Sequence, residues 1–219
     1  MARRFWVLGA ACIGLLFAHR TPAGPDKPSA TIRLKVSVFN DAQVPPFVLR
    51  EAGRRAQAVF DEAGISLTWL DCGTPEHRNT ELGCKDLAYP THLSVRLIAG
   101  KQAASRDIFG QSFLNENGEG NYASVYLTPL SSAKALELVR EGDLLGYVVV
   151  HELGHLLLGK NSHSGEGLMR SKWELSELRE AAKGNLLFTR SETDRMRVRY
   201  WSAVTRAEGG SSSFKLSGK

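Results

Sequence analysis

The chain has 219 residues, of which 42% are hydrophobic and 23% are charged, and its formal net charge at pH 7 is +5. A chain of this length and composition can form one domain with a substantial core, which excludes wholly disordered and fibrous proteins. The basic residues are scattered rather than gathered in a patch, so no nucleic-acid partner is expected.

The N-terminal residues are typical of a secretory signal peptide. Arg3 and Arg4 precede the uncharged apolar run Phe5–Ala18, and a stretch with Pro and Gly follows. The run is shorter than the roughly 20 apolar residues that span a bilayer. We therefore predict a signal peptide at 1–23, a linker at 24–30 and a secreted or periplasmic protein with no stable membrane insertion after cleavage. The alternative is a retained N-terminal membrane anchor.

Export affects how the cysteines are interpreted. Cys12 lies inside the apolar run, whereas Cys72 and Cys84 flank a polar loop rich in Gly, Pro, Asn and Glu. Two such cysteines usually pair in an oxidising compartment, and the alternative is a pair of metal ligands. We predict a disulfide between Cys72 and Cys84 that closes this loop.

Hydrophobic periodicity predicts the elements that follow the linker. Strands are expected where apolar residues alternate, and helices where they form a stripe. The predicted strands are 32–38, 65–69, 92–98 and 122–127, and the predicted helices are 45–63, 129–141, 144–158, 174–183 and 191–204. Residues 105–121 are predicted to form a loop, and 208–219 a disordered tail. The order predicts one α+β domain at 31–207, with a small mixed β-sheet, a backing helix and a helical C-terminal part.

The sequence HELGH, from His151 to His155, lies on a strongly apolar predicted helix with Asp143 as N-cap and Gly159 as C-cap. His151 and His155 lie one turn apart on the same face and can bind one metal ion. Glu152 can act on a water at that metal as a general base. Two histidines and a glutamate are costly to bury in such a helix unless a partner such as Zn²⁺ satisfies them. The alternative is a pair of hydrogen-bonded histidines without a metal.

A zinc site needs a third protein ligand, and the residues after the helix offer one. His163 follows Gly159, and Gly167-Leu168-Met169 comes soon after. Here the sequence resembles the metzincin metalloproteases, whose pattern H-E-x-x-H-x-x-G-x-x-H precedes a methionine turn. The matching residues are His151, Glu152, His155, Gly159, His163 and Met169. The glycine falls one residue late and the last histidine two residues late, with Asn161 in the usual place of the third histidine.

The metzincin resemblance implies a fold and a function. It implies a zincin-like fold, Zn²⁺ held by His151, His155 and His163, and Met169 in a turn beneath the metal. It also implies a secreted zinc metalloendopeptidase that cleaves peptide or protein substrates. The strand at 122–127 would be the sheet edge that pairs with an extended substrate. Residues 143–173 are also similar to a group of secreted bacterial proteins.

Other interpretations of the metal site stay open at this point. Some zincins take the third ligand from a downstream helix, where this chain has Glu174, Glu177 and Glu180. A zinc amide hydrolase of the gluzincin type, with Glu174 or Glu177 as third ligand, is therefore one alternative. A non-catalytic binding protein stabilised by zinc is another. The sequence indicates no particular substrate, no oxyanion-stabilising residue and no oligomeric state.

Overall fold

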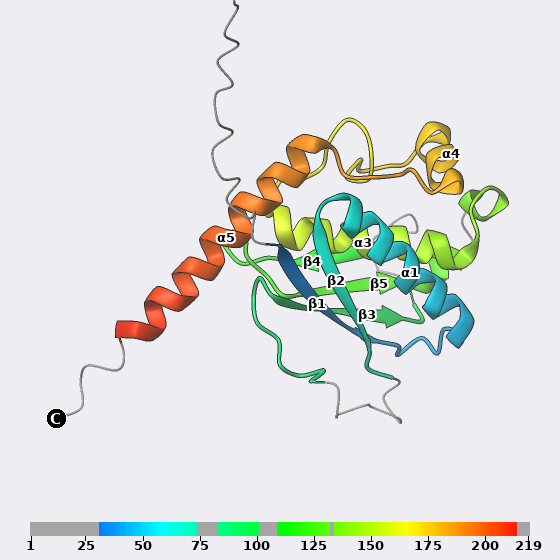
Figure 1. The fold of residues 1–219 in the computed structure, drawn as a ribbon. Helices are drawn as coiled ribbons and strands as arrows, with labels where there is room; N and C mark the ends of the chain where they lie inside the picture. Colours follow the sequence, from blue (N-terminus) through cyan, green and yellow to red (C-terminus); the bar gives the residue numbers. More distant parts are fainter. Residues whose placement is uncertain (1–30, 74–82, 101–108, 132–133, 214–219) are drawn as a thin grey trace, which may run out of the picture. The chain divides into compact units, whose positions relative to one another are not determined.

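A five-stranded sheet forms the frame of the domain in the computed structural model, which describes residues 31–73, 83–100, 109–131 and 134–213 (Figure 1). The strands are β1 (Ile32–Phe39), β2 (Ile65–Asp71), β3 (His92–Ile98), β4 (Gly110–Phe113) and β5 (Tyr122–Tyr126). Their spatial order is β2-β1-β3-β5-β4. Four strands run parallel, and β4 pairs antiparallel with β5. The predicted small mixed sheet is confirmed, whereas the predicted signal peptide and linker lie outside the described residues.

Helices pack on this sheet and form the rest of the domain. They are α1 (Pro46–Glu62), α2 (Leu127–Ser131), α3 (Glu141–Leu158), α4 (Leu175–Lys183) and α5 (Arg190–Ser213), with a 3₁₀ turn at Lys134–Glu137. Helix α1 contacts β2 and α3, and α3 in turn contacts β4 and β5. The apolar sequence of α3 is thereby buried on nearly all sides. The predicted backing helix and helical C-terminal part are therefore present.

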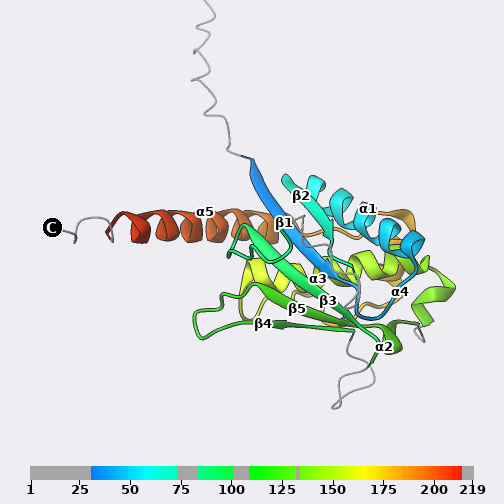
Figure 2. The same ribbon diagram turned by 90° about the horizontal axis from the view of Figure 1, so that it is seen from below.

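Strand β4 corrects two expectations. It lies within 105–121, which the sequence predicted to be a loop, and Figure 2 shows it at the outer edge of the sheet. The segment Gly110–Phe113 has no apolar alternation. Its strand forms because β5 offers an unpaired row of backbone groups, which a short antiparallel strand can satisfy. The strand at 122–127 is therefore an interior strand, and the expectation that it is the sheet edge is wrong.

The start of α3 also differs from expectation. The predicted helix at 129–141 is replaced by α2 and the 3₁₀ turn, and α3 begins at Glu141 rather than after Asp143. Asp143 does not cap the helix. Its carboxylate instead accepts hydrogen bonds from Arg55 of α1 at 3.0 Å and from Arg140 at 2.9 Å. These charge-assisted bonds hold α3 to α1, so the acidic residue is used between helices rather than at a helix end.

The last helix extends further than the sequence predicts. Helix α5 continues past the expected end at Val204 to Ser213, into the segment 208–219 that was expected to be disordered. Extending an existing helix adds one hydrogen bond for each residue fixed, which is easier than starting one. Across the part of the chain that the structure describes, every helix is too short or too polar to cross a bilayer.

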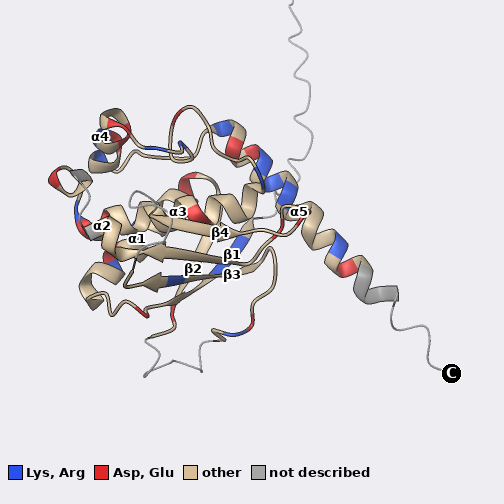
Figure 3. Ribbon diagram, turned by 180° about the vertical axis from the view of Figure 1, so that it is seen from behind, with Lys and Arg blue, Asp and Glu red and all other residues tan. Residues whose placement is uncertain are grey.

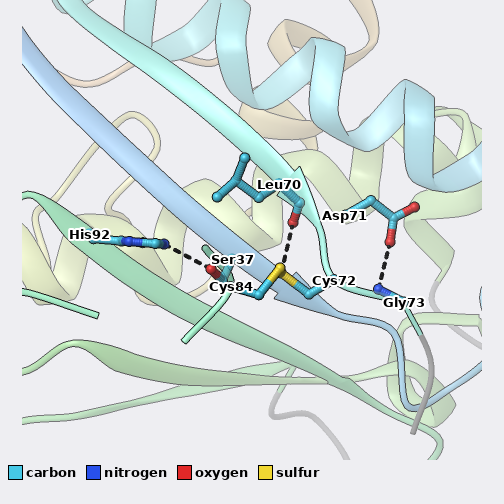
Figure 4. The surroundings of a disulfide bond; sticks show 7 residues. All are labelled: Ser37, Leu70, Asp71, Cys72, Gly73, Cys84 and His92. Carbon is cyan, nitrogen blue, oxygen red and sulfur yellow. Dashed lines mark hydrogen bonds between the residues drawn. A yellow bond between two sulfur atoms is a disulfide. The ribbon is translucent and has the colours of Figure 1, made fainter. Parts of the chain in front are cut away.

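The cysteine pair links the end of β2 to the segment before β3 (Figure 4). Cys72 and Cys84 form a disulfide with an S–S distance of 2.06 Å, and both residues are buried. Close to it, the His92 ring is hydrogen-bonded through Nε2 to the Ser37 hydroxyl at 2.8 Å. The covalent bond closes the polar loop between the two strands.

Replacing Cys72 and Cys84 together by alanine is expected to lower the free energy of unfolding by about 3 kcal/mol. A disulfide that closes a loop of 12 residues restricts the unfolded chain by about that amount. Urea unfolding of the two proteins measures the difference, and the native protein in reducing buffer serves as the control, because it should match the double variant. An unchanged urea midpoint would contradict the expectation.

Candidate metal site

Three histidine rings meet at the C-terminal end of α3. His151 and His155 are partly buried on one face of the helix. Gly159, with a φ of 82°, ends the helix, and Asn161, with a φ of 54°, turns the chain back toward it. This turn brings the exposed ring of His163 to a centroid distance of 4.6 Å from the ring of His155. One ring nitrogen from each histidine lies within 4.8 Å of the other two, so the three could hold a metal ion.

Hydrogen bonds fix the orientation of the two helix histidines. The Nδ1 atom of His151 lies 2.8 Å from the main-chain oxygen of Leu168, and that of His155 lies 2.6 Å from the hydroxyl of Ser162. A carbonyl oxygen can only accept, so His151 donates through Nδ1 and carries its lone pair on Nε2. Partners of this kind commonly orient metal-binding imidazoles.

The second ring nitrogens of the two helix histidines lie close to the spacing that one ion requires. The Nε2 atoms of His151 and His155 are 3.1 Å apart. Two nitrogens bound tetrahedrally to one zinc ion are about 3.4 Å apart, given Zn–N distances of about 2.1 Å. The donor set of three imidazoles therefore fits a zinc ion, which these residues would hold through one nitrogen each.

Burial keeps the histidines neutral at pH 7. Loss of hydration lowers the pKa of His151 to about 4, and the nearby His163 adds to the effect. The pKa of His155 is lowered to about 3, first by burial and then by repulsion from the other two rings. Partial loss of hydration also lowers the pKa of His163 below its ordinary value, although this residue is more exposed than the other two. Neutral imidazoles are the form that binds metals.

The Glu152 side chain contacts the edge strand β4. The hydroxyl of Ser112 lies 2.7 Å from the carboxylate Oε2 of Glu152 and 2.7 Å from the main-chain oxygen of Glu152. Gly110 makes this contact possible, since a Cβ at that position would come within 2.5 Å of Oε1. Burial raises the pKa of Glu152 to about 7, while the Ser112 hydrogen bond acts in the opposite direction. The carboxyl group can therefore gain or lose a proton near neutral pH.

Met169 lies directly against the metal-site helix. It is fully buried, and a Cβ on Gly154 would come within 2.5 Å of its sulfur and 3.0 Å of the Phe188 ring. The residue before it, Leu168, accepts through its carbonyl from both His151 and the indole nitrogen of Trp173, the latter at 3.0 Å. The turn around Met169 thus supports the helix backbone and orients one histidine.

The glutamates that were considered as rival ligands are engaged elsewhere. Arg170 lies 2.9 Å from the carboxylate of Glu174 and 3.2 Å from that of Glu177. Glu177 also accepts from the backbone N–H of Glu174 and so completes the capping box of α4. Glu180 pairs with Lys183 at 2.8 Å. None of them belongs to the histidine group found among the described residues, so the alternative of a glutamate third ligand lacks support.

Four residues of the site were not found by sequence reasoning. Ser112 and Gly110 lie in a segment that was expected to be a loop, and nothing in Gly-Gln-Ser-Phe indicates contact with a helix far along the chain. Ser162 and Trp173 support His155 and Leu168, respectively. Only the position of Ser162 next to His163 offered a signal, and a single neighbouring serine is too common to interpret.

Comparisons with known proteins give only a distant structural likeness. No protein-family model matches the chain, and no curated protein does. It is similar to archaemetzincin from Methanopyrus kandleri, with 18% identity and a TM-score of 0.48, over 79% of this chain and 97% of that one. It is also similar to a zinc-dependent peptidase from Methanocorpusculum labreanum, with 14% identity and a TM-score of 0.48, over 74% of this chain and 99% of that one. Likeness at this level carries no inference about activity.

Replacing Gly154 by alanine is expected to destabilise the protein by up to about 2 kcal/mol. The added methyl group would overlap the Met169 sulfur, and overpacking of about 1–3 kcal/mol outweighs the gain of about 1 kcal/mol in helix propensity. Thermal and urea unfolding measure the change. Gly165→Ala is the matched control, because a Cβ there meets nothing within 4 Å and should change stability by less than about 0.5 kcal/mol. Equal effects of the two substitutions would contradict the packing described above.

Proposed function

We propose that the protein is a secreted zinc-dependent endopeptidase in which Glu152 is the general base. One observation carries the proposal. One ring nitrogen from each of three histidines lies within 4.8 Å of the other two, and the residue that follows His151 on the same helix, Glu152, is a buried carboxyl group whose pKa is raised to about 7. A site that only stabilised the fold would need the three ligands but would not need a neighbouring carboxyl group with a raised pKa.

The residues of the chain divide the chemistry between them. His151, His155 and His163 would hold the zinc ion, which supplies a Lewis acid for the scissile carbonyl and acidifies an attacking water. Glu152 accepts the proton of that water and later delivers it to the departing amine, which its pKa near 7 permits in both directions. Ser112 holds Oε2 and so positions the carboxylate for this transfer.

The edge of the sheet is the proposed place for a peptide. Among the described strands β4 is the last in the sheet and has no strand on its outer side, and two of its residues, Gly110 and Ser112, contact Glu152 directly. An extended chain that adds to β4 would therefore run next to the general base. A cavity of about 520 Å³ also opens beside His163, which gives the metal site access to solvent. Peptide and protein chains are the substrates that suit this geometry.

Export is proposed from the sequence and is consistent with the chemistry of the cysteines. The segment 1–23 has the composition of a signal peptide, and 24–30 that of a linker. The disulfide between Cys72 and Cys84 suits an oxidising compartment. We place the catalytic domain at 31–207, outside the cytoplasm.

His163→Ala is expected to lower zinc affinity by more than about 100-fold, because the loss of a ligand costs more than the 10- to 100-fold loss of an outer partner. Competition with a chromogenic chelator measures the affinity. Ser162→Ala is the matched variant. Its zinc affinity should fall by only about 10- to 100-fold, because it removes only the hydrogen bond to His155. If His163→Ala bound zinc as tightly as the native protein, the third ligand would lie elsewhere.

Glu152→Gln is expected to retain zinc and to lower peptide hydrolysis by about 10²–10⁴-fold, the usual contribution of a general base. Cleavage of an unstructured protein, followed by mass spectrometry, measures the activity, and metal analysis measures the zinc content. Glu180→Gln on α4 is the control and should behave as the native protein. Full activity of Glu152→Gln would refute the mechanism. Zinc binding by a native protein that cleaves nothing would favour the zinc-stabilised binding protein.

A further inference from the structure

A second and larger cavity lies beside the candidate metal site. It has a volume of about 820 Å³ and is bounded by the hairpin at 116–118, the end of α3 and the first turns of α5. It shares Ser191 and Arg195 with the smaller cavity that His163 lines. The larger cavity, called the α5 groove below, is thus the immediate neighbour of the metal site.

Positive charge predominates in the α5 groove. Four basic residues line it against two acidic ones, Glu116 and Asp194; the basic residues are Lys160, Arg190, Arg195 and Arg199. Figure 3 shows Lys and Arg recurring along the first turns of α5. A groove of this balance favours an anionic occupant.

The basic residues differ in how they are held. Arg199 donates to the main-chain oxygens of Leu157 and Gly118, at 3.1 and 2.9 Å, and Lys160 donates to that of Glu116 at 3.0 Å. Arg190 and Arg195 are exposed, and the ion pairs found among the described residues include neither of them. These two guanidinium groups are therefore free to bind a ligand.

The smaller cavity next to the metal has a different charge. Glu166 and Glu192 line it together with Arg195. Glu192 is buried, and its carboxylate accepts from the backbone N–H of Thr189 at 2.7 Å, so it is fixed at the start of α5. A carboxylate next to the metal would meet two acidic residues and one arginine, whereas one in the α5 groove would meet two acidic residues and four basic ones.

The proposed path of a peptide leads from the metal to this groove. Strand β4 ends at the exposed Phe113, and the chain continues into the turn at 115–118, where the backbone N–H of Gly118 donates to Asn115 at 3.0 Å. The same turn forms one wall of the α5 groove. A peptide extended along β4 past Phe113 would therefore reach Arg190 and Arg195.

We propose that the α5 groove is a substrate subsite that binds an Asp or Glu side chain of the peptide through Arg190 and Arg195, several residues from the scissile bond. This inference rests on the proposed peptidase function. It makes the protein selective for acidic segments of an extended chain, and it places the preferred acidic residue away from the scissile bond rather than next to it.

Binding of two matched fluorescent peptides tests the proposal. One peptide is unstructured and carries three Glu residues, and the other carries Gln at the same positions. Fluorescence anisotropy with the full-length, zinc-loaded Glu152→Gln protein keeps the peptides intact. The Glu peptide is expected to bind about five-fold tighter or more, given up to about 1 kcal/mol for each exposed charge pair. The preference should shrink as added salt screens the charges.

Substitution of the arginines identifies the site. Arg190→Glu combined with Arg195→Glu should abolish the preference for the Glu peptide and leave binding of the Gln peptide unchanged. Arg179→Glu is the matched control, because Arg179 is an exposed arginine on α4 that does not line the groove. If the protein with Arg190 and Arg195 intact bound the two peptides with equal affinity, the proposal would be overturned. An equal loss in the double variant and in the control would also overturn it.

Cleavage by the native enzyme separates this inference from the function on which it rests. If the protein cleaves both peptides at similar rates with equal affinity, the subsite is refuted and the peptidase stands. If it binds the Glu peptide through Arg190 and Arg195 but cleaves neither peptide, the groove stands as a site for acidic chains and the peptidase is refuted.

Discussion

The burial of three ionisable side chains within one apolar helix is the constraint on which the rest of the structure depends. His151, Glu152 and His155 belong to α3, which contacts α1, α4, α5 and the sheet. Each of the three needs a polar partner, because an unsatisfied polar group in such surroundings is costly. The partners come from three other segments: Ser112 from β4, Leu168 from the turn that carries Met169, and Ser162 from the loop after the helix. The site therefore requires much of the fold to be in place.

The sequence predicted those parts of the site that are close together along the chain. The spacing of His151 and His155 follows from helix geometry, and Gly159 is recognisable as a helix end because glycine adopts positive φ without strain. His163 was reachable because only a short loop separates it from the helix. Hydrophobic periodicity predicted the longer strands of the sheet and the backing helix, because their apolar residues must face a common core.

The parts that the sequence did not predict depend on contacts between distant segments. Strand β4 forms because β5 presents a free edge, and Gln111 and Ser112 carry no pattern that could indicate this. Asp143 has the residue type of a helix cap, but two arginines bind it instead, one of them 88 residues away. The role of Glu177 is similar. Its charge suggested a metal ligand, but its carboxylate accepts hydrogen bonds from Arg170 and from the backbone at the start of α4. For Asp143 and Glu177 the residue type indicated a polar role, and contacts with distant segments decided which partner each one has.

The edge strand that was missed has a consequence for what the protein could act on. An open strand edge accepts only a backbone that is itself extended and has its own N–H and C=O groups free. Natively folded proteins rarely offer such a segment, because their backbone groups are already paired. Under the proposed function, a folded neighbour in the same compartment would be spared, and a chain that has unfolded, or has not yet folded, would be recognised by its loss of structure.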